Sequence, residues 1–211
     1  MQIERIFYPV KTLGYGLRIG IWTIGCPHGC FNCSNPELWN ENPNKDISMK
    51  KLFELFSTIN GPIDGLTVTG GEPFSQPNEL YELIKEFKLK YTDDILIYTG
   101  YTIEQLQSMK HEKIDEILNN IAVLIDGLYI EELNDNQPLR GSSNQRVHIL
   151  NSSYREKYES LLSGKRTVQT VFNNDEIISI GIPLKGFKTH VPTLLKNEYG
   201  IKATNSKGRV E

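Results

Sequence analysis

All three cysteines of this chain lie in one short loop, and that loop constrains the fold more than any other feature of the sequence. Cys26, Cys30 and Cys33 follow the spacing C-x3-C-x2-C within the stretch GCPHGCFNCSNPELW. Three thiolates at this spacing can hold three irons of a cubane and leave the fourth iron without a protein ligand. An iron left open in this way is a place where chemistry can occur.

Two other interpretations of the cysteine loop stay open. His28 lies inside it, so a zinc site of three cysteines and one histidine is stereochemically conceivable, although the paired spacing of a zinc finger is absent. Three unrelated reduced thiols are the second alternative. Clustered cysteines in a chain of intracellular character usually bind metal, which favours the open cluster.

The length and composition of the chain are those of an ordinary globular protein. Its 211 residues suit one domain, with room for an appendage. A formal net charge of -3 gives no global attraction for nucleic acid or for an acidic membrane, so neither partner is expected. The N-terminus lacks a signal sequence, and no apolar run approaches the roughly 20 residues of a membrane span. We therefore expect a cytoplasmic protein.

Short apolar strands alternate with helices along the first two thirds of the chain. Strands are expected at residues 17–24, 66–69, 95–98 and 121–125. Helix starts are marked by a Ser48 cap, by Pro77 in a first turn and by a capping box of Thr102 with Gln105. This alternation implies parallel strands joined by right-handed crossovers, hence an α/β sheet or barrel. A closed eight-stranded barrel typically needs about 250 residues, so the chain is too short for one.

Loops that follow the carboxyl ends of parallel strands build the active site in such folds. Four polar or glycine-rich segments fall at these positions: the cysteine loop, Gly70 to Pro73, Thr99 to Tyr101, and the stretch from Asp126 onward. Each has an ordinary structural alternative, as a tight turn, a helix cap or a buried ion pair. Their convergence at strand ends predicts one active site. Arg18, inside the first apolar strand, is expected to be paired or to point to the mouth of this site.

These segments resemble the radical S-adenosylmethionine (SAM) superfamily, and within it the small activating enzymes of glycyl-radical enzymes, most of all those that act on anaerobic ribonucleotide reductase. The resemblance also includes Gly16-Leu17-Arg18 ahead of the cysteine loop and the later stretches LIDG and RGSSNQ. The segments come in the family's order and cover about residues 14 to 146. Superfamily members often place an aromatic just before the third cysteine, whereas this chain has Asn32 there and Phe31 one position earlier.

The resemblance implies a partial (β/α)6 radical SAM barrel that holds a [4Fe-4S] cluster on Cys26, Cys30 and Cys33. SAM would chelate the open iron and be cleaved reductively to a 5′-deoxyadenosyl radical, which abstracts a hydrogen from a glycine Cα of a partner glycyl-radical enzyme. A flavodoxin- or ferredoxin-type protein would donate the electron. The cluster performs the difficult step, so no side chain is expected to act as a catalytic acid, base or nucleophile.

The resemblance also implies a set of SAM-binding residues. In the glycine-rich segment, missing side chains let backbone carbonyls approach the ammonium of SAM, and Tyr101 would lie beside the adenosine. Asp126 needs a polar partner because it ends an apolar strand, and the candidates are the SAM ribose, an active-site cation and Arg140. The expected SAM-binding residues are Thr69, Gly70, Gly71, Glu72, Thr99, Tyr101, Asp126, Arg140, Ser142 and Asn144.

Beyond Arg146 the resemblance ends, which places a radical SAM domain at residues 1–150 and a C-terminal helix-plus-hairpin extension at residues 151–211. Ser153 with Glu156 is expected to cap a helix that ends near Gly164. Strands are expected at residues 167–172 and 177–182, and a basic, partly disordered tail from Lys185 to Glu211. We expect removal of residues 151–211 to spare cluster assembly.

Two functional alternatives accompany the activase hypothesis. One is a small radical SAM enzyme that acts on a small molecule such as a deazapurine precursor. The other is a non-enzymatic iron-sulfur or zinc protein. Release of 5′-deoxyadenosine from SAM on reduction separates the radical SAM enzymes from the non-enzymatic proteins.

Overall fold

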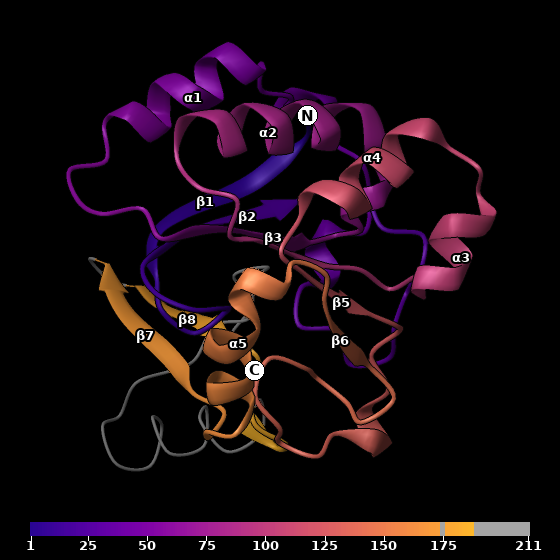
Figure 1. Cartoon of the computed structure of the whole chain (residues 1–211). Helices are drawn as coiled ribbons and strands as arrows, with labels where there is room; N and C mark the ends of the chain where they lie inside the picture. Colours follow the sequence, from indigo (N-terminus) through magenta and orange to yellow (C-terminus); the bar gives the residue numbers. More distant parts are fainter. Residues whose placement is uncertain (174–175, 188–211) are drawn as a thin grey trace.

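A computed structural model describes residues 1–173 and 176–187, and its central feature is a six-stranded sheet with strands in chain order (Figure 1). The strands are β1 (Ile3–Val10), β2 (Arg18–Thr23), β3 (Gly65–Gly70), β4 (Ile95–Tyr98), β5 (Val123–Asp126) and β6 (Arg146–Ile149). The helices are α1 (Met49–Ser57), α2 (Pro77–Lys90), α3 (Ile103–Ser108), α4 (Glu112–Asn120) and α5 (Arg155–Leu162). A separate two-stranded sheet pairs β7 (Val168–Asn173) with β8 (Glu176–Gly181).

The four strands predicted from the sequence are the parallel ones. β2 to β5 pair in parallel, whereas the edge strands β1 and β6 run antiparallel to their neighbours. The mixed α/β class is therefore confirmed with a mostly parallel sheet. The β/α alternation stops at β5, because the connection from residue 127 to residue 145 contains a short 3₁₀ turn, Glu131–Leu133, and no α-helix. A parallel crossover usually contains such a helix, and here the chain instead returns antiparallel to β5.

Three predicted helix starts are confirmed and one is wrong. The Ser48 side chain accepts a hydrogen bond from the Lys51 N–H, Pro77 opens α2, and Thr102 with Gln105 forms the capping box of α3. No Ser153–Glu156 box exists, because the Asn151 side chain takes the Ser153 N–H and caps a 3₁₀ turn that runs directly into α5. The chain turns two residues earlier than we predicted.

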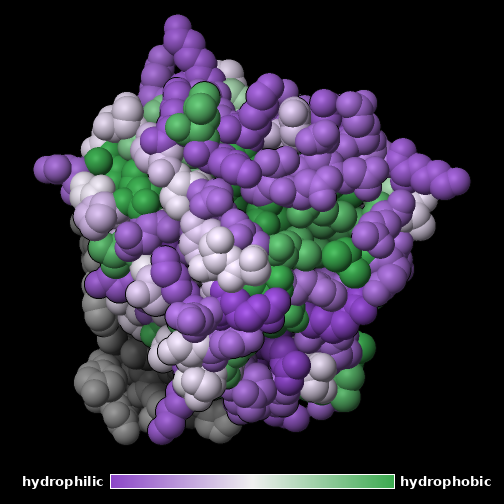
Figure 2. Space-filling model, viewed as in Figure 1, coloured by the Kyte–Doolittle hydropathy of each residue, from purple (hydrophilic) through white to green (hydrophobic). Residues whose placement is uncertain are grey.

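The two faces of the sheet are covered by different parts of the chain. On one face, Ile19, Ile21 and Val68 pack against apolar side chains of α1, α2 and α4. These helices turn hydrophilic residues outward, which gives the top of the molecule its polar surface (Figure 2). This is the usual arrangement of an amphipathic helix on a sheet.

The opposite face of the sheet is covered by the C-terminal extension (Figure 1). Ile180 of β8 lies in an apolar cluster with Val10 and Trp22, and Tyr158 of α5 lies in another with Val123. The predicted hairpin is confirmed as β7 and β8. The basic tail lies outside the described residues from position 188 on. Among the described helices, none has the length and apolarity that crossing a membrane requires.

Candidate active site

Backbone hydrogen bonds join the four predicted segments at the carboxyl ends of β2 to β5. The Glu72 N–H donates to the Gly25 carbonyl at 2.7 Å, which ties the β3 loop to the start of the cysteine loop. On the other side, the Gly127 N–H donates to the Tyr101 carbonyl at 2.9 Å and ties the β5 loop to the β4 loop. The Glu72 side chain joins these two pairs through Thr99 and Gly100, so segments that are far apart in the sequence form one continuous rim.

The Glu72 carboxylate is the centre of this rim. Its side chain is buried, and one oxygen accepts hydrogen bonds from the Phe74 N–H and the Thr99 hydroxyl, both at 2.9 Å. The other oxygen accepts from the Gly100 N–H at 2.8 Å and lies 2.9 Å from Nε2 of His28. A buried carboxylate needs this many donors to offset its lost hydration. Glu72 therefore holds three loops together through its side chain.

His28 points from the cysteine loop toward the β3 and β4 loops. Besides its contact with Glu72, its ring meets the edge of the Tyr101 ring at a centroid distance of 4.6 Å. A zinc ligand would instead direct a ring nitrogen to the same ion as the thiolates, at about 2.0–2.1 Å. Within residues 1–173 and 176–187, no three His, Cys, Asp or Glu side chains lie close enough to hold a single metal ion.

The three thiols suit a cluster in which each thiolate binds a different iron. All three cysteines are free and partly buried, and Cys33 is close enough to the other two to act on their pKa values. Burial raises the pKa of Cys26 and of Cys30, while the backbone N–H groups of His28 and Tyr129 oppose this by pointing at the two sulfurs. Such N–H groups stabilise thiolates and tune bound clusters. Cluster binding must displace the thiol protons.

The glycines after β3 allow two loops to approach closely. Gly70 has φ of 102°, in the region that favours glycine. At Gly71, a Cβ atom would lie 2.5 Å from the Gly25 carbonyl oxygen. Any side chain there would push the β3 loop away from the cysteine loop. The first role of Gly71 is therefore to let these loops meet.

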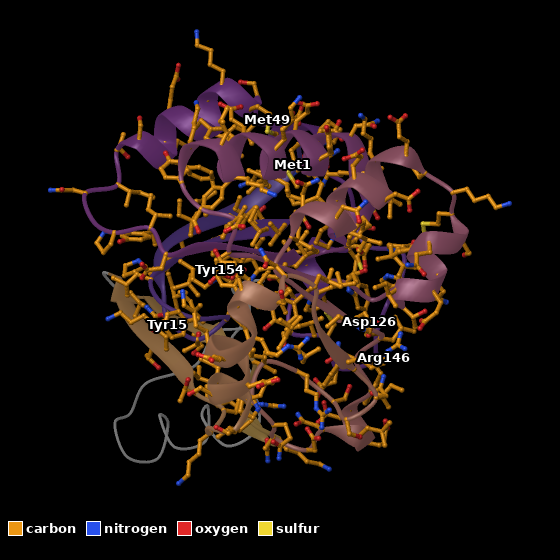
Figure 3. The ribbon with its side chains drawn as sticks, viewed as in Figure 1. Met1, Tyr15, Met49, Asp126, Arg146 and Tyr154 are labelled. Atoms are coloured by element: carbon orange, nitrogen blue, oxygen red, sulfur yellow. The ribbon has the colours of Figure 1, made fainter. Side chains whose placement is uncertain are left out.

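Asp126 has partners, but Arg140 is not one of them. Its buried carboxylate accepts from Arg146 at 2.6 and 3.1 Å and from the Ile103 N–H at 2.8 Å, and it lies 3.0 Å from Nε2 of His148. Figure 3 shows Asp126 and Arg146 next to each other. Burial alone would raise the pKa of Asp126, but the hydrogen bonds from Arg146 and Ile103, together with the nearby His148 ring, lower it overall.

Sequence analysis missed the Asp126 partnership because β6 was not predicted. In the antiparallel register of β5 and β6, Asp126 lies opposite Arg146. Arg140 instead pairs with Asp135 at 2.6 Å. The alternation of polar and apolar residues in Arg146–Ile149 is the signal that would have indicated a half-buried strand here.

The polar residues of the RGSSNQ stretch connect to the loop after β5. The Ser142 hydroxyl accepts from the Ile130 N–H at 3.2 Å, and the Asn144 side chain donates to the Leu128 carbonyl at 2.8 Å. Gln145 donates to the Gly127 carbonyl at 2.8 Å. These side chains hold the two loops against each other, beside the cysteine loop.

Comparison with known proteins matches this geometry to a family. The model of the 4Fe-4S single cluster domain family matches residues 12–148. The chain belongs to this family. It is 33% identical over 151 residues to the anaerobic ribonucleoside-triphosphate reductase-activating protein of Enterobacteria phage T4, which covers 70% of this chain and 93% of that protein. The protein of the same description from Salmonella typhi is 29% identical over 68% of this chain and 96% of its own length.

A pyruvate formate-lyase-activating enzyme from Staphylococcus epidermidis is 25% identical over 65% of this chain, which spans 55% of that enzyme. Together these matches confirm the predicted radical SAM activase family, the enzyme class, and the [4Fe-4S] cluster and SAM as its cofactors. The family model ends at residue 148, so α5 and the β7–β8 hairpin lie beyond it.

Proposed function

We propose that this protein activates a glycyl-radical enzyme by abstracting a hydrogen from a glycine Cα, and that the enzyme is an anaerobic ribonucleotide reductase. The observation that carries the proposal is the rim around Glu72, which joins the cysteine loop to the loops after β3 and β4. The six-stranded sheet, in which β2 to β5 are parallel, would then be a smaller version of the family's partial (β/α)6 barrel. The similarity to the phage T4 activating protein supports this choice of partner.

When bound and reduced, the cluster would supply one electron for splitting SAM into methionine and a 5′-deoxyadenosyl radical, and that radical would take the glycine hydrogen and leave as 5′-deoxyadenosine. Cys26, Cys30 and Cys33 hold the cluster. The backbone at Gly70 and Gly71 would bind the methionine part of SAM. A flavodoxin- or ferredoxin-type protein provides the electron.

The remaining residues shape the SAM site. Thr99 and Tyr101 would flank the adenosine, while Thr69 would lie with Gly70 and Gly71 beside the methionine part. Glu72, Asp126, Arg140, Ser142 and Asn144 serve the site by fixing its loops, since their side chains already bind protein groups. The protein's contribution is placement: it holds the reacting groups in position and excludes water from them.

The surface beside the cysteine loop suits a polypeptide substrate. Phe31 is 78% exposed, Leu128 43% and Ile130 38%. The Asn32 side chain donates to Glu131 at 3.0 Å, which places the loop after β5 next to the cysteine loop. Apolar side chains exposed around a catalytic rim are typical of protein contact surfaces. This favours an incoming peptide loop over a small metabolite.

Anaerobic reconstitution tests the proposal. The wild-type protein should bind about four irons per chain and release 5′-deoxyadenosine from SAM on reduction, whereas Cys26→Ala, Cys30→Ala and Cys33→Ala should each abolish that release. A colourless, folded protein with stoichiometric zinc under iron-replete conditions would contradict it.

The partner is tested by mixing the reduced protein with SAM and an anaerobic ribonucleotide reductase. We expect a glycyl-radical doublet in the electron paramagnetic resonance spectrum, and its splitting should collapse when the reductase glycine is deuterated at Cα. Absence of the doublet with every glycyl-radical enzyme of the same organism, together with turnover of a free metabolite, would favour the small-molecule alternative.

A further inference from the structure

The segment beyond the family match inserts one arginine into the loop that precedes the RGSSNQ stretch. The Arg166 side chain is only 2% exposed. Its Nε donates to the Gln137 carbonyl at 2.9 Å, and Nη1 donates to Oδ1 of Asn134 at 3.0 Å and to the Pro183 carbonyl at 2.9 Å. Nη2 donates to the Arg140 carbonyl. One guanidinium thus binds residues 134–140 at three points and the end of the hairpin at a fourth.

The loop at residues 134–141 has a backbone that needs such support. Asn136 and Leu139 have φ of 57° and 62°, the left-handed region that side chains other than glycine rarely adopt. Strained conformations persist only where surrounding contacts over-determine them. Arginine offers five N–H donors in a fixed planar fork, so it can bind several backbone carbonyls at once, which lysine cannot.

Two more contacts from the extension reach the same loop. Leu139 is 3% exposed and lies in one apolar cluster with Tyr158 of α5. The Lys185 N–H, after the hairpin, donates to Oδ1 of Asn136 at 2.8 Å. The helix, the approach to β7 and the segment after β8 therefore all hold one loop.

The held loop leads directly into the rim of the active site. Gln145 accepts from the Gly141 N–H at 2.7 Å and donates to the Gly127 carbonyl at 2.8 Å. Asn144 donates to the Leu128 carbonyl. A displacement at residues 137–141 would pass through these bonds to the loop after β5, beside the cysteine loop.

We infer that Arg166 is a positioning residue for the SAM site, and that residues 152–187 are part of the catalytic unit. Arg166 fixes residues 134–141, and these fix the Arg140 to Gln145 stretch against the loop after β5. The inference rests on the proposed function for the claim that this rim binds SAM. The claim that Arg166 fixes the loop is independent of it.

Three variants separate this role from general stabilisation. Arg166→Ala removes all the donors, and Arg166→Lys keeps the charge but loses the fork. Gln169→Ala is the matched control, because Gln169 binds the Pro9 carbonyl and the Lys11 N–H at 2.9 and 3.0 Å and so ties the hairpin to the end of β1. Circular dichroism establishes that each variant is folded under the assay conditions.

Two readouts are compared: the rate of tryptic cleavage after Arg140, followed by mass spectrometry, and the dissociation constant of SAM for the reconstituted, unreduced protein. We expect Arg166→Ala to raise both about tenfold, Arg166→Lys to restore neither fully, and Gln169→Ala to leave both within twofold. If Arg166→Ala does not fold, Arg166→Lys carries the comparison with Gln169→Ala.

Equal values for the Arg166 variants and Gln169→Ala would overturn the inference. Faster cleavage after Arg140 with unchanged SAM binding would also overturn it, because the loop would then be held without serving the site. A wild-type protein that binds no SAM would contradict the proposed function, while the cleavage rates would still report whether Arg166 fixes the loop.

Discussion

Asp94 at the amino end of the parallel strands and Glu72 at their carboxyl end are both buried carboxylates, and they are satisfied in different ways. At the amino end, Asp94 forms an ion pair with Arg18 at 2.9 Å and accepts from the Tyr158 hydroxyl at 2.6 Å. At the carboxyl end, Glu72 receives backbone N–H groups, the Thr99 hydroxyl and a ring nitrogen of His28. One carboxylate is balanced by a fixed cation, the other mainly by neutral donors on loops.

This difference indicates that the amino end of the strands serves stability and the carboxyl end serves function. Arg18 is completely buried and also donates to the Thr67 hydroxyl and to the Leu66 and Asp94 carbonyls, so its network is closed on all sides. The network around Glu72 is made of loops that glycines allow to approach. In parallel α/β folds the carboxyl end carries the chemistry and the opposite end carries stability. Substitutions at the two ends should therefore have different consequences.

The largest effect on stability is expected from Asp94→Asn, which leaves the Arg18 charge buried without its counter-ion. Breaking a buried ion pair by removing one partner typically costs 3–5 kcal/mol, so we expect the free energy of unfolding in urea to fall by about that amount. The SAM dissociation constant of the protein that remains folded should stay within twofold of wild type.

Glu159→Gln is the matched control for Asp94→Asn. It removes the carboxylate from an exposed ion pair with Arg155, 3.4 Å long, and should cost less than about 0.5 kcal/mol. If Asp94→Asn lowers the free energy of unfolding by less than about 1 kcal/mol, the amino end does not carry the stability we assign to it. If its folded fraction binds SAM more weakly, the amino end also affects function, and the two ends do not differ as proposed.

A smaller loss of stability but a larger loss of function is expected from Glu72→Gln. An amide in place of the carboxylate turns one acceptor into a donor, which then faces the Gly100 N–H or the Phe74 N–H. Leaving a buried hydrogen bond unmade costs about 1–3 kcal/mol. Because three loops lose their common anchor, we also expect SAM binding to weaken about tenfold.

Hydrogen exchange at the Gly100 amide provides a direct readout of this anchor, since that N–H donates to Glu72. Exchange should be faster in Glu72→Gln. His28→Gln, which disturbs only one of the contacts, should give an intermediate rate. Unchanged exchange and unchanged SAM affinity in Glu72→Gln would show that the carboxylate does not hold the loops.

The sequence was sufficient to predict the parts of the molecule that are set by local pattern. The strands β2 to β5 are short, mostly apolar and largely buried runs, as expected for strands covered on both faces. The positions of the cysteine loop and the glycine-rich loop follow from where these runs end. Caps at Ser48 and Thr102 were predictable for the same reason, because a cap depends on residues three positions apart.

Contacts between distant residues were not predictable from spacing. Glu72 and His28 are 44 positions apart, and nothing in either neighbourhood indicates the other. β1 was missed because its partly exposed residues lack a clear period, and β6 because two of its four residues are polar, unlike the apolar runs of β4 and β5. Arg166 follows Lys165 in a stretch without resemblance to any motif. Its role depends on the left-handed backbone at Asn136 and Leu139, which only the folded loop shows.

Substitution of Asp126 tests what determines the effect of losing a buried carboxylate: its place at one end of the strands, or its ion pair with an arginine. Asp126 lies at the carboxyl end like Glu72, yet it is paired with an arginine like Asp94. If pairing governs, Asp126→Asn should lower stability and leave the SAM dissociation constant within twofold of wild type, which is the outcome we expect. The Arg146 side chain is 45% exposed, so the loss at neutral pH should be about 1–2 kcal/mol, below that for Asp94→Asn.

The pH dependence of unfolding identifies this contribution, because the folded pKa of Asp126 lies below its usual value. A lowered folded pKa adds stability above the unfolded pKa of about 4, and that stability is lost as the pH falls through the folded pKa. The difference between wild type and Asp126→Asn should therefore be full at pH 6 and shrink below about pH 4. Glu104→Gln, which removes only the exposed second partner of Arg146, should change stability far less. A strong loss of SAM affinity in Asp126→Asn at unchanged stability would instead show that position at the carboxyl end, and not the ion pair, determines what a buried carboxylate does in this protein.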